Sequence, residues 1–363
     1  MKAKISIWQL FWLVFSFQIG LTLLMVIRPA IQIAKQDIWI SVMIAGIGVI
    51  FIAIISVKVS MLYPDQTLIQ FSQTILGKWF GKIIVIPYFI MWFFATGMIL
   101  RQFSDFVHIA MFERTPLWAL ILPFVLLGAY TTKKGGIEVV ARCCEIIGPI
   151  VAISFLTLVI FNWGNMDLKN IFPIYADSGG LTIVKGSIPI LSFLGEAVLI
   201  MMTVPFIAKP QKTLFGILAG GGLTVLFVLI SSVVVISTFG PELSSKMLFP
   251  PYEIVRFIST MEFIQNMDVA VVMIWFFTYF VKMVTYFFFT SYATAQWLEL
   301  KEWKKTIWVV AAIVFMIALW PKNFDYITTD FMMYWEKYVL PINMIAIPLL
   351  LLIVGIIRKK TKR

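Results

Sequence analysis

Ten apolar stretches constrain the possible fold of this chain more than any other feature. They cover residues 6–27, 38–60, 83–108, 116–131, 139–162, 187–207, 213–238, 269–298, 306–320 and 338–357. A transmembrane helix needs about 20 mostly apolar residues, and the fourth and ninth stretches are the short ones. The sequence therefore predicts an all-α integral membrane protein with ten transmembrane helices, in a single membrane domain over residues 1–363.

The composition supports a multi-spanning membrane protein. Hydrophobic residues make up 61% of the chain and charged residues only 13%, whereas a soluble domain carries about a quarter charged residues. A net charge of +11 would suit nucleic acid only if the basic residues shared one solvated face. They fall instead in short clusters between apolar stretches, so we expect the lipid bilayer, and not nucleic acid, as a partner.

The N-terminal apolar run, Ile5 to Ile27, is longer than the region of about 7–15 residues in a secretory signal. It also lacks a small-residue cleavage site, so we expect it to be retained as the first span.

Cys143 and Cys144 are adjacent, which suits neither a disulfide nor a metal motif, and we interpret them as packing residues. The sequence shows no nucleophile–base pair, metal cluster or phosphate-binding loop, so we expect no enzyme activity, no cofactor and no metal.

The distribution of Lys and Arg predicts the orientation. If both termini are cytoplasmic, 18 of the 29 basic residues fall in inner loops and 9 in outer loops, while Arg101 and Lys282 lie within spans. Because inner loops carry an excess of basic residues, both termini are expected to be cytoplasmic.

Two connecting segments, 61–82 and 249–268, have helical apolar periodicity and are expected to be interfacial helices. Their apolar faces carry Leu68, Phe71, Ile75 and Trp79, and Ile254, Phe257, Ile258 and Met261.

Glu196 lies deep in the sixth apolar stretch, directly after Gly195 and between Pro189 and Pro205. A charged side chain at the centre of a membrane helix costs about 2.5–3.5 kcal/mol on insertion scales, so it faces a bundle interior or a wet cavity. A glycine–acid pair between two prolines predicts an interrupted helix that lines a ligand-sized, wet binding cavity. The alternative is a buried acid that is paired for structural reasons alone.

Lys282 is equally deep in the eighth stretch. Its helical face is shared by Thr278, Thr285, Tyr286 and Phe289. Its ammonium could occupy the place of a bound cation, pair with Glu196, or take part in protonation. A purely structural ion pair stays open as well.

The first stretch contains Gln18 and Gly20 among apolar residues. With Gly195 in the sixth, they suggest interruptions at matching places in two five-span halves, about 6–162 and 187–357. This pattern predicts an inverted repeat with a site at the membrane midplane. In the third stretch Arg101 and Asp105 have the i,i+4 spacing of a helical ion pair, which we expect near the outer interface.

Several segments together resemble the spore germination B-subunit family, the GerAB-type membrane subunits of germinant receptors. They are "ISIWQLFWLVFSFQIG", "KKGGIEVVARCCEIIGPI", "FLGEA" and "FPPYEIVRFISTMEFIQNMD". The resemblance extends over about residues 5–357. That family is similar to the amino acid–polyamine–organocation (APC) transporters, so the resemblance implies a LeuT-like 5+5 inverted repeat with helices 1 and 6 broken.

The resemblance also implies a function. Members act with an A subunit and a lipoprotein C subunit in the spore inner membrane, where they sense a small nutrient, an amino acid or a sugar, and trigger germination and ion release. The alternatives are a proton- or cation-coupled amino acid transporter of the same fold, and a scaffold subunit that binds no ligand. A sugar would need hydroxyl partners as well as aromatic rings on which to stack. The eighth stretch has many aromatic residues but only scattered hydroxyls, which favours an amino acid over a sugar.

Carried over by position, the family's ligand-binding region falls on eight residues: Gln18, Gly20, Gly97, Arg101, Gly195, Glu196, Lys282 and Thr285. Many relatives carry a second acid directly after the glycine–acid pair. Here Ala197 follows Glu196, so a role that needs two adjacent carboxylates is not expected.

Overall fold

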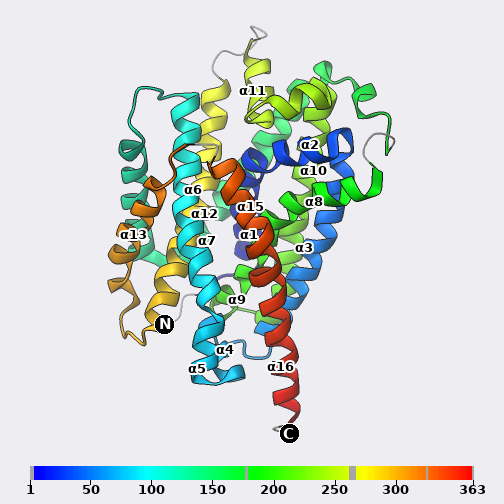
Figure 1. Cartoon of the computed structure of the whole chain (residues 1–363). Coiled ribbons are helices and arrows are strands. Elements are labelled where there is room, and N and C mark those ends of the chain that lie inside the picture. The colour runs from blue at the N-terminus through cyan, green and yellow to red at the C-terminus, as the bar shows by residue number, and fades with distance from the viewer. Residues whose placement is uncertain (1–3, 176–178, 261–266, 324–325, 362–363) are drawn as a thin grey trace.

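The computed structural model of this chain describes residues 4–175, 179–260, 267–323 and 326–361. These residues form a bundle of helices, most of them running along one direction (Figure 1). The first half contains α1 (Ile7–Met25), α2 (Ile27–Ala34), η1 (Lys35–Asp37), α3 (Ile38–Ser60), α4 (Leu68–Leu76), α5 (Lys78–Ile84), α6 (Ile86–Ala110), α7 (Leu117–Asn162), η2 (Trp163–Asn165) and η3 (Leu168–Ile171).

The second half begins with helix 6, our name for the consecutive segments α8 (Gly179–Leu194), η4 (Gly195–Leu199), α9 (Ile200–Thr203) and η5 (Val204–Phe206). It continues with η6 (Pro210–Lys212), α10 (Thr213–Lys246), α11 (Pro250–Thr260), α12 (Met267–Trp297), η7 (Trp303–Lys305), α13 (Ile307–Leu319), η8 (Ile327–Phe331), α15 (Met332–Tyr334), η9 (Trp335–Ala346) and α16 (Ile347–Thr361). Among the described residues, the one β-type feature outside the helices is a parallel bridge between Ile5 and Ile207.

Eight of the described helices are long and apolar enough to cross a membrane. The predicted spans 116–131 and 139–162 are the two arms of α7, and the predicted span 306–320 is α13, which has 13 residues. At 1.5 Å per residue α13 is about 20 Å long, shorter than the bilayer core of about 30 Å. The all-helical membrane fold is confirmed, while the count of ten spans stays a prediction.

Gly136 divides α7 into its two arms. Its φ of +54° and ψ of −146° are not helical, and glycine adopts such angles without the steric cost that a Cβ brings. Without this change of direction, 46 residues of helix would extend about 69 Å, more than twice the thickness of the bilayer core. A single glycine therefore gives the chain two arms of spanning length.

The last helical region begins earlier than predicted. The sequence indicated a span over 338–357, but the chain is helical from Ile327 onwards. Asp330, Glu336 and Lys337 resemble loop residues in sequence, and Pro341 has no N–H to donate. Pro341 removes one backbone donor from the helical hydrogen-bond pattern. The helix continues past it with the wider π-type pattern of η9.

The two connecting segments predicted to be helical do form helices, with corrections, while their place at the membrane interface stays a prediction. In α4, Leu68, Phe71 and Ile75 are buried as expected, but Trp79 is 77% exposed, because Gly77, at φ +90°, ends α4 and Trp79 belongs to α5. In α11, Ile254 and Ile258 are buried as expected, but Phe257 is exposed; Met261 lies outside the described residues. α4 and α5 lie at the end of the bundle towards which α16 runs, and α2 and α11 at the other end (Figure 1).

Candidate functional site

Helix 6 changes its helix type at the predicted glycine. The α-helix ends at Leu194, and the five residues Gly195–Leu199 form the tighter 3-10 helix η4. A Cβ added to Gly195 would lie 2.7 Å from Met344 Sδ and 3.1 Å from Ile52 Cδ1, so glycine also allows η9 and α3 to approach closely. The predicted interruption is therefore a tightened segment rather than an unwound one.

Side chains from other helices satisfy the carbonyl groups near this change. Gln18 Nε2 of α1 donates to the Leu194 carbonyl at 2.8 Å. Trp335 Nε1 of η9 donates to the Ser192 carbonyl at 3.0 Å. Carbonyls at the end of an α-helix have no intrahelical donor, so these bonds fix α1 and η9 against helix 6 where its backbone pattern changes.

The interruption of the first span lies later than predicted. α1 continues through Gln18 and Gly20 to Met25, and the break falls at Val26, where α2 follows. Pro29 has no N–H for the Met25 carbonyl, which ends the regular pattern there. Gly20 serves close packing, because a Cβ at this position would collide with the Thr278 hydroxyl of α12.

Glu196 and Lys282 form a buried ion pair. Lys282 Nζ lies 2.6 Å from Glu196 Oε2, and the two side chains are 1% and 3% exposed. The ammonium also lies 5.1 Å from the ring centroid of Phe17 and 5.3 Å from that of Phe193. The pairing that we considered from the sequence is confirmed, and it joins η4 to the middle of α12.

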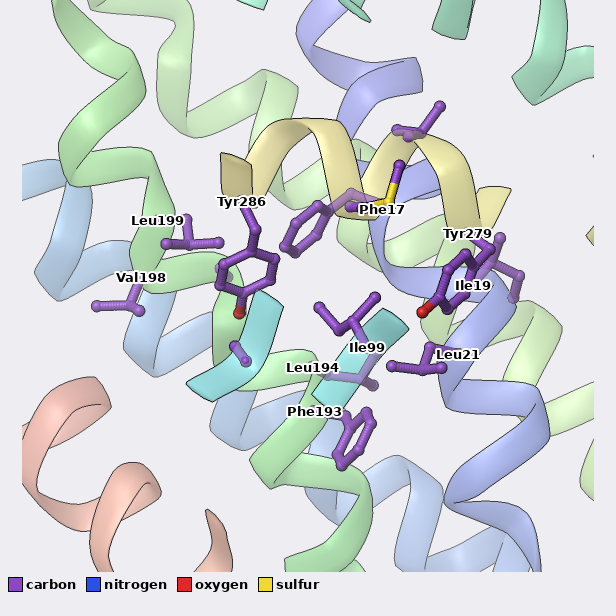
Figure 2. Close-up of a cluster of buried hydrophobic side chains, with 14 of the residues drawn as sticks. Phe17, Ile19, Leu21, Ile99, Phe193, Leu194, Val198, Leu199, Tyr279 and Tyr286 are labelled. Atoms are coloured by element: carbon purple, nitrogen blue, oxygen red, sulfur yellow. The ribbon is translucent and has the colours of Figure 1, made fainter. Parts of the chain in front are cut away.

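Aromatic side chains enclose this pair. The Tyr286 and Phe17 rings are 5.5 Å apart, and the Tyr286 hydroxyl lies near the Glu196 carboxylate. Figure 2 shows Phe17 of α1, Tyr286 of α12 and Phe193 of helix 6 in one cluster of buried hydrophobic side chains. These three aromatic residues were not among the eight predicted ligand-binding residues, although the spacing of four places Tyr286 on the helical face of Lys282.

The cavity at the pair is small. Gln18, Glu196, Thr203 and Thr285 line it together with apolar residues, and its volume is about 40 Å³. That volume holds a water molecule or two, whereas binding sites for small molecules occupy roughly 300–1,000 Å³. The expected ligand-sized chamber is thus not open in this conformation, since the two charges contact each other and aromatic rings fill the surrounding space.

Gly97 and Arg101 lie against α13 rather than at the ion pair. A Cβ on Gly97 would meet Ile317. Arg101 Nε pairs with Asp105 at 2.9 Å, and its Nη1 donates to the carbonyls of Ala318 and Pro321. The predicted i,i+4 pair is confirmed, and it is buried because the guanidinium also satisfies carbonyls at the end of α13. Its place near the outer interface stays a prediction.

The predicted site residues thus fall into two groups. Gln18, Glu196 and Thr285 line one cavity, with Lys282 paired to Glu196 and Gly195 beside it. Gly20 supports the same helix packing from α1, while Gly97 and Arg101 belong to the contact between α6 and α13. In the described part of the chain, no three His, Cys, Asp or Glu side chains are grouped as a metal site would need.

Solved structures with a similar fold are membrane transporters. The chain superposes on MhsT, solved in complex with L-phenylalanine, with a TM-score of 0.63 over 98% of this chain and 99% of that one, at 11% identity. It superposes on the inward-facing form of Mhp1, a nucleobase-cation-symport-1 family transporter, with a TM-score of 0.65 over 94% and 75% of the two chains, also at 11% identity. At this identity the similarity establishes the fold, which is the LeuT fold.

Sequence comparison identifies the family. Spore germination protein YndE of Bacillus subtilis (strain 168) is 27% identical over 92% of this chain and 90% of its own length. Spore germination protein KB of the same organism is 24% identical over 99% and 97% of the two chains. The family model described as "Spore germination protein" matches residues 4–327. This LeuT-fold, multi-pass membrane protein therefore belongs to the spore germination protein family.

Proposed function

We propose that this chain is the nutrient-sensing membrane subunit of a spore germinant receptor, and that its nutrient binds at the Glu196–Lys282 pair. The observation that carries the proposal is this ion pair, buried where η4 meets α12. Membership in the spore germination family supports the role in germination. The proposal assigns no chemical reaction and no cofactor to the chain.

The charges of the pair suit an amino acid better than a sugar. The carboxylate of a zwitterion would replace Glu196 beside the Lys282 ammonium, and its own ammonium would replace Lys282 beside Glu196. Each buried charge would exchange one partner for another. No charge would be left unpaired, and it is an unpaired charge that is costly in an apolar interior. A sugar offers hydroxyl groups only and would leave both charges without a charged partner.

Binding must be coupled to a movement of helices. A cavity of about 40 Å³ does not hold an amino acid, so α12 has to separate from α1 and helix 6 around the pair. A ligand shifts an equilibrium between two conformations by its difference in affinity for them. In our proposal this shift passes the signal to the A and C subunits in the spore inner membrane and leads to ion release.

The orientation of the chain is part of the proposal. Both termini would be cytoplasmic, in line with the excess of Lys and Arg in the loops on that side. α2 and α11 would then lie on the outer side, from which a nutrient arrives. The Arg358–Lys360 run at the end of α16 would lie at the inner surface.

A charge-swap experiment in spores tests the proposal. Glu196→Gln and Lys282→Met should each raise the nutrient concentration needed for half-maximal germination by tenfold or more, or abolish germination. The double variant Glu196→Lys with Lys282→Glu keeps an ion pair of reversed polarity. If the pair binds the nutrient, this variant should reach the membrane in normal amounts and still respond poorly.

The control is the exposed pair between Arg142 and Glu138, whose side chains are 67% and 32% exposed. Arg142→Met should leave the dose response unchanged. A charge-swapped protein that restores the normal dose response would show that the pair is purely structural, and the proposed site would be wrong.

A coupled amino acid transporter of the same fold is the second candidate. The similarity to MhsT and Mhp1 favours it, since both are transporters. Purified chain in liposomes, given labelled amino acids with and without a proton or sodium gradient, separates the two functions. Gradient-driven accumulation without other subunits would support the transporter.

A further inference from the structure

We infer that a second cavity, at the end of the bundle that carries α2 and α11, binds a small carboxylate through Arg28. This cavity has a volume of about 230 Å³, several times that at the ion pair. Residues from α1, α2, η8 and the link between α10 and α11 line it, among them Leu24, Met25, Arg28, Gln32, Leu248 and Thr329. It is separate from the Glu196–Lys282 site, because ten residues of α1 and α2 between Gln18 and Arg28 correspond to roughly 15 Å of helix.

Arg28 is the charged group of this cavity. Its Nε is buried and has no hydrogen-bond partner, and within the described residues it forms no ion pair. Arg101 and Arg142, in contrast, are paired with Asp105 and Glu138. A buried donor without a partner costs about 1–3 kcal/mol, so an anion in the cavity would complete the interactions of this guanidinium.

The chemistry of the lining selects a monovalent carboxylate. A planar guanidinium matches the two oxygens of a carboxylate in a bidentate arrangement. Within the described lining Arg28 is the one cation, which suits a single negative charge better than a dianion. Thr329 is exposed to the cavity and can donate from its hydroxyl, while Gln32 is held by its bond to the Ser245 carbonyl at 3.0 Å.

Cysteine labelling at the cavity tests the site. In a background with Cys143→Ser and Cys144→Ser, Thr329→Cys provides a single thiol in the purified full-length chain. A negatively charged methanethiosulfonate should modify it about tenfold faster than a positively charged one, as expected for electrostatic attraction in a concave site. Arg28→Gln should remove this preference, and Arg28→Lys should keep most of it. If Thr329→Cys does not fold, Gln32→Cys offers a second position in the same cavity.

Competition identifies the occupant. Sodium acetate should slow the anionic reagent several-fold more than sodium chloride of the same ionic strength, and should lose this effect in Arg28→Gln. Equal rates for the two reagents, or equal protection by acetate and chloride, would overturn the proposal. Protection by phosphatidylglycerol in nanodiscs without protection by acetate would overturn it in favour of a lipid phosphate. Arg142→Met, at the exposed pair, should leave acetate protection unchanged. Because the test measures acetate and not the nutrient, its outcome is independent of the site proposed above.

Discussion

Lys282 shows how a full charge is held in the middle of this membrane protein. A carboxylate lies on one side of its ammonium, and the faces of Phe17 and Phe193 lie close to it. Contacts between a cation and a ring contribute about 0.5–2 kcal/mol each, which is less than the several kcal/mol needed to desolvate the charge. The Glu196 carboxylate therefore supplies the decisive interaction, and the two residues depend on each other.

This dependence predicts strong energetic coupling between the two residues. Glu196→Gln or Lys282→Met alone should destabilise the protein by about 3–5 kcal/mol, because each leaves one buried charge without its partner. The double variant Glu196→Gln with Lys282→Met should lose less stability than the sum of the two single losses. Denaturant unfolding of all four proteins in one detergent measures the coupling energy, and additive losses would contradict it.

Gly20 gives a steric prediction at the same scale. Gly20→Ala places a Cβ against the Thr278 hydroxyl, and such overpacking costs about 1–3 kcal/mol. Thr278→Ala should recover part of this loss, because it removes the colliding oxygen. Gly222→Ala in α10 is the matched control, since no atom lies within 4 Å of its added Cβ. Thermal unfolding should show a lower Tm for the first variant and no loss for the control.

At the scale of helices, the sequence predicts where apolar segments lie better than how they are shaped. α3 covers Ile38–Ser60, the predicted range, because length and hydropathy are local properties. The break of the first span was predicted at Gly20 and lies at Val26, since the role of Gly20 depends on Thr278 of a distant helix.

The candidate site was predictable to a similar extent. The depth of Glu196 and Lys282 could be derived from the sequence, and their cost in an apolar medium pointed to a partner. The direction in which Gly97 and Arg101 face depends on their contacts with α13. No spacing within α6 could reveal this.

The joint of α7 gives a prediction about a whole element. Gly136→Ala places a side chain at φ +54° and ψ −146°, a conformation that costs about 1–3 kcal/mol for residues other than glycine. We expect a lower Tm and a smaller amount of protein in the membrane. Gly164→Ala, with open space around its Cβ and no positive φ, should change neither quantity.

At the scale of the whole molecule, two links join distant parts of the chain at the α4–α5 end. The first, which we call the tether, consists of Ile5 N donating to the Phe206 carbonyl at 2.7 Å and Ala208 N donating to the Ile5 carbonyl at 2.9 Å. The second, the latch, joins α5 to the end of α12, because Lys82 and Lys78 pair with Glu299 at 2.8 and 3.2 Å.

The latch should depend on pH. Hydrogen bonds from Lys82 and Lys78 lower the pKa of the Glu299 carboxyl. Because the folded-state pKa is the lower one, the stabilising effect is complete above the unfolded value of about 4.3 and is lost as the pH falls through the folded value. Spin labels on Phe80→Cys and Leu300→Cys, in the cysteine-free background, should give a narrow distance distribution at neutral pH that broadens on acidification.

Glu299→Gln should broaden that distribution at every pH. Glu302→Gln is the control, because Glu302 pairs with Lys305 in its own segment and not with α5. A distribution that stays narrow in Glu299→Gln would show that the latch does not hold α5.

The two links differ in what they would restrict during ligand binding. The tether connects the chain before α1 with the end of helix 6, so it joins two elements that can move together. The latch fixes the end of α12 to α5, so it would restrict a movement of α12 away from α1 and helix 6. Reversible thiol cross-linking of Phe80→Cys to Leu300→Cys should therefore reduce nutrient binding or germination more than tenfold, and a reductant should restore it. Cross-linking Ile5→Cys to Ile207→Cys should change the response less than twofold. The reverse result, with the tether sensitive and the latch tolerant, would mean that α1 and helix 6 separate at this end, and that α12 and α5 remain together when the nutrient binds.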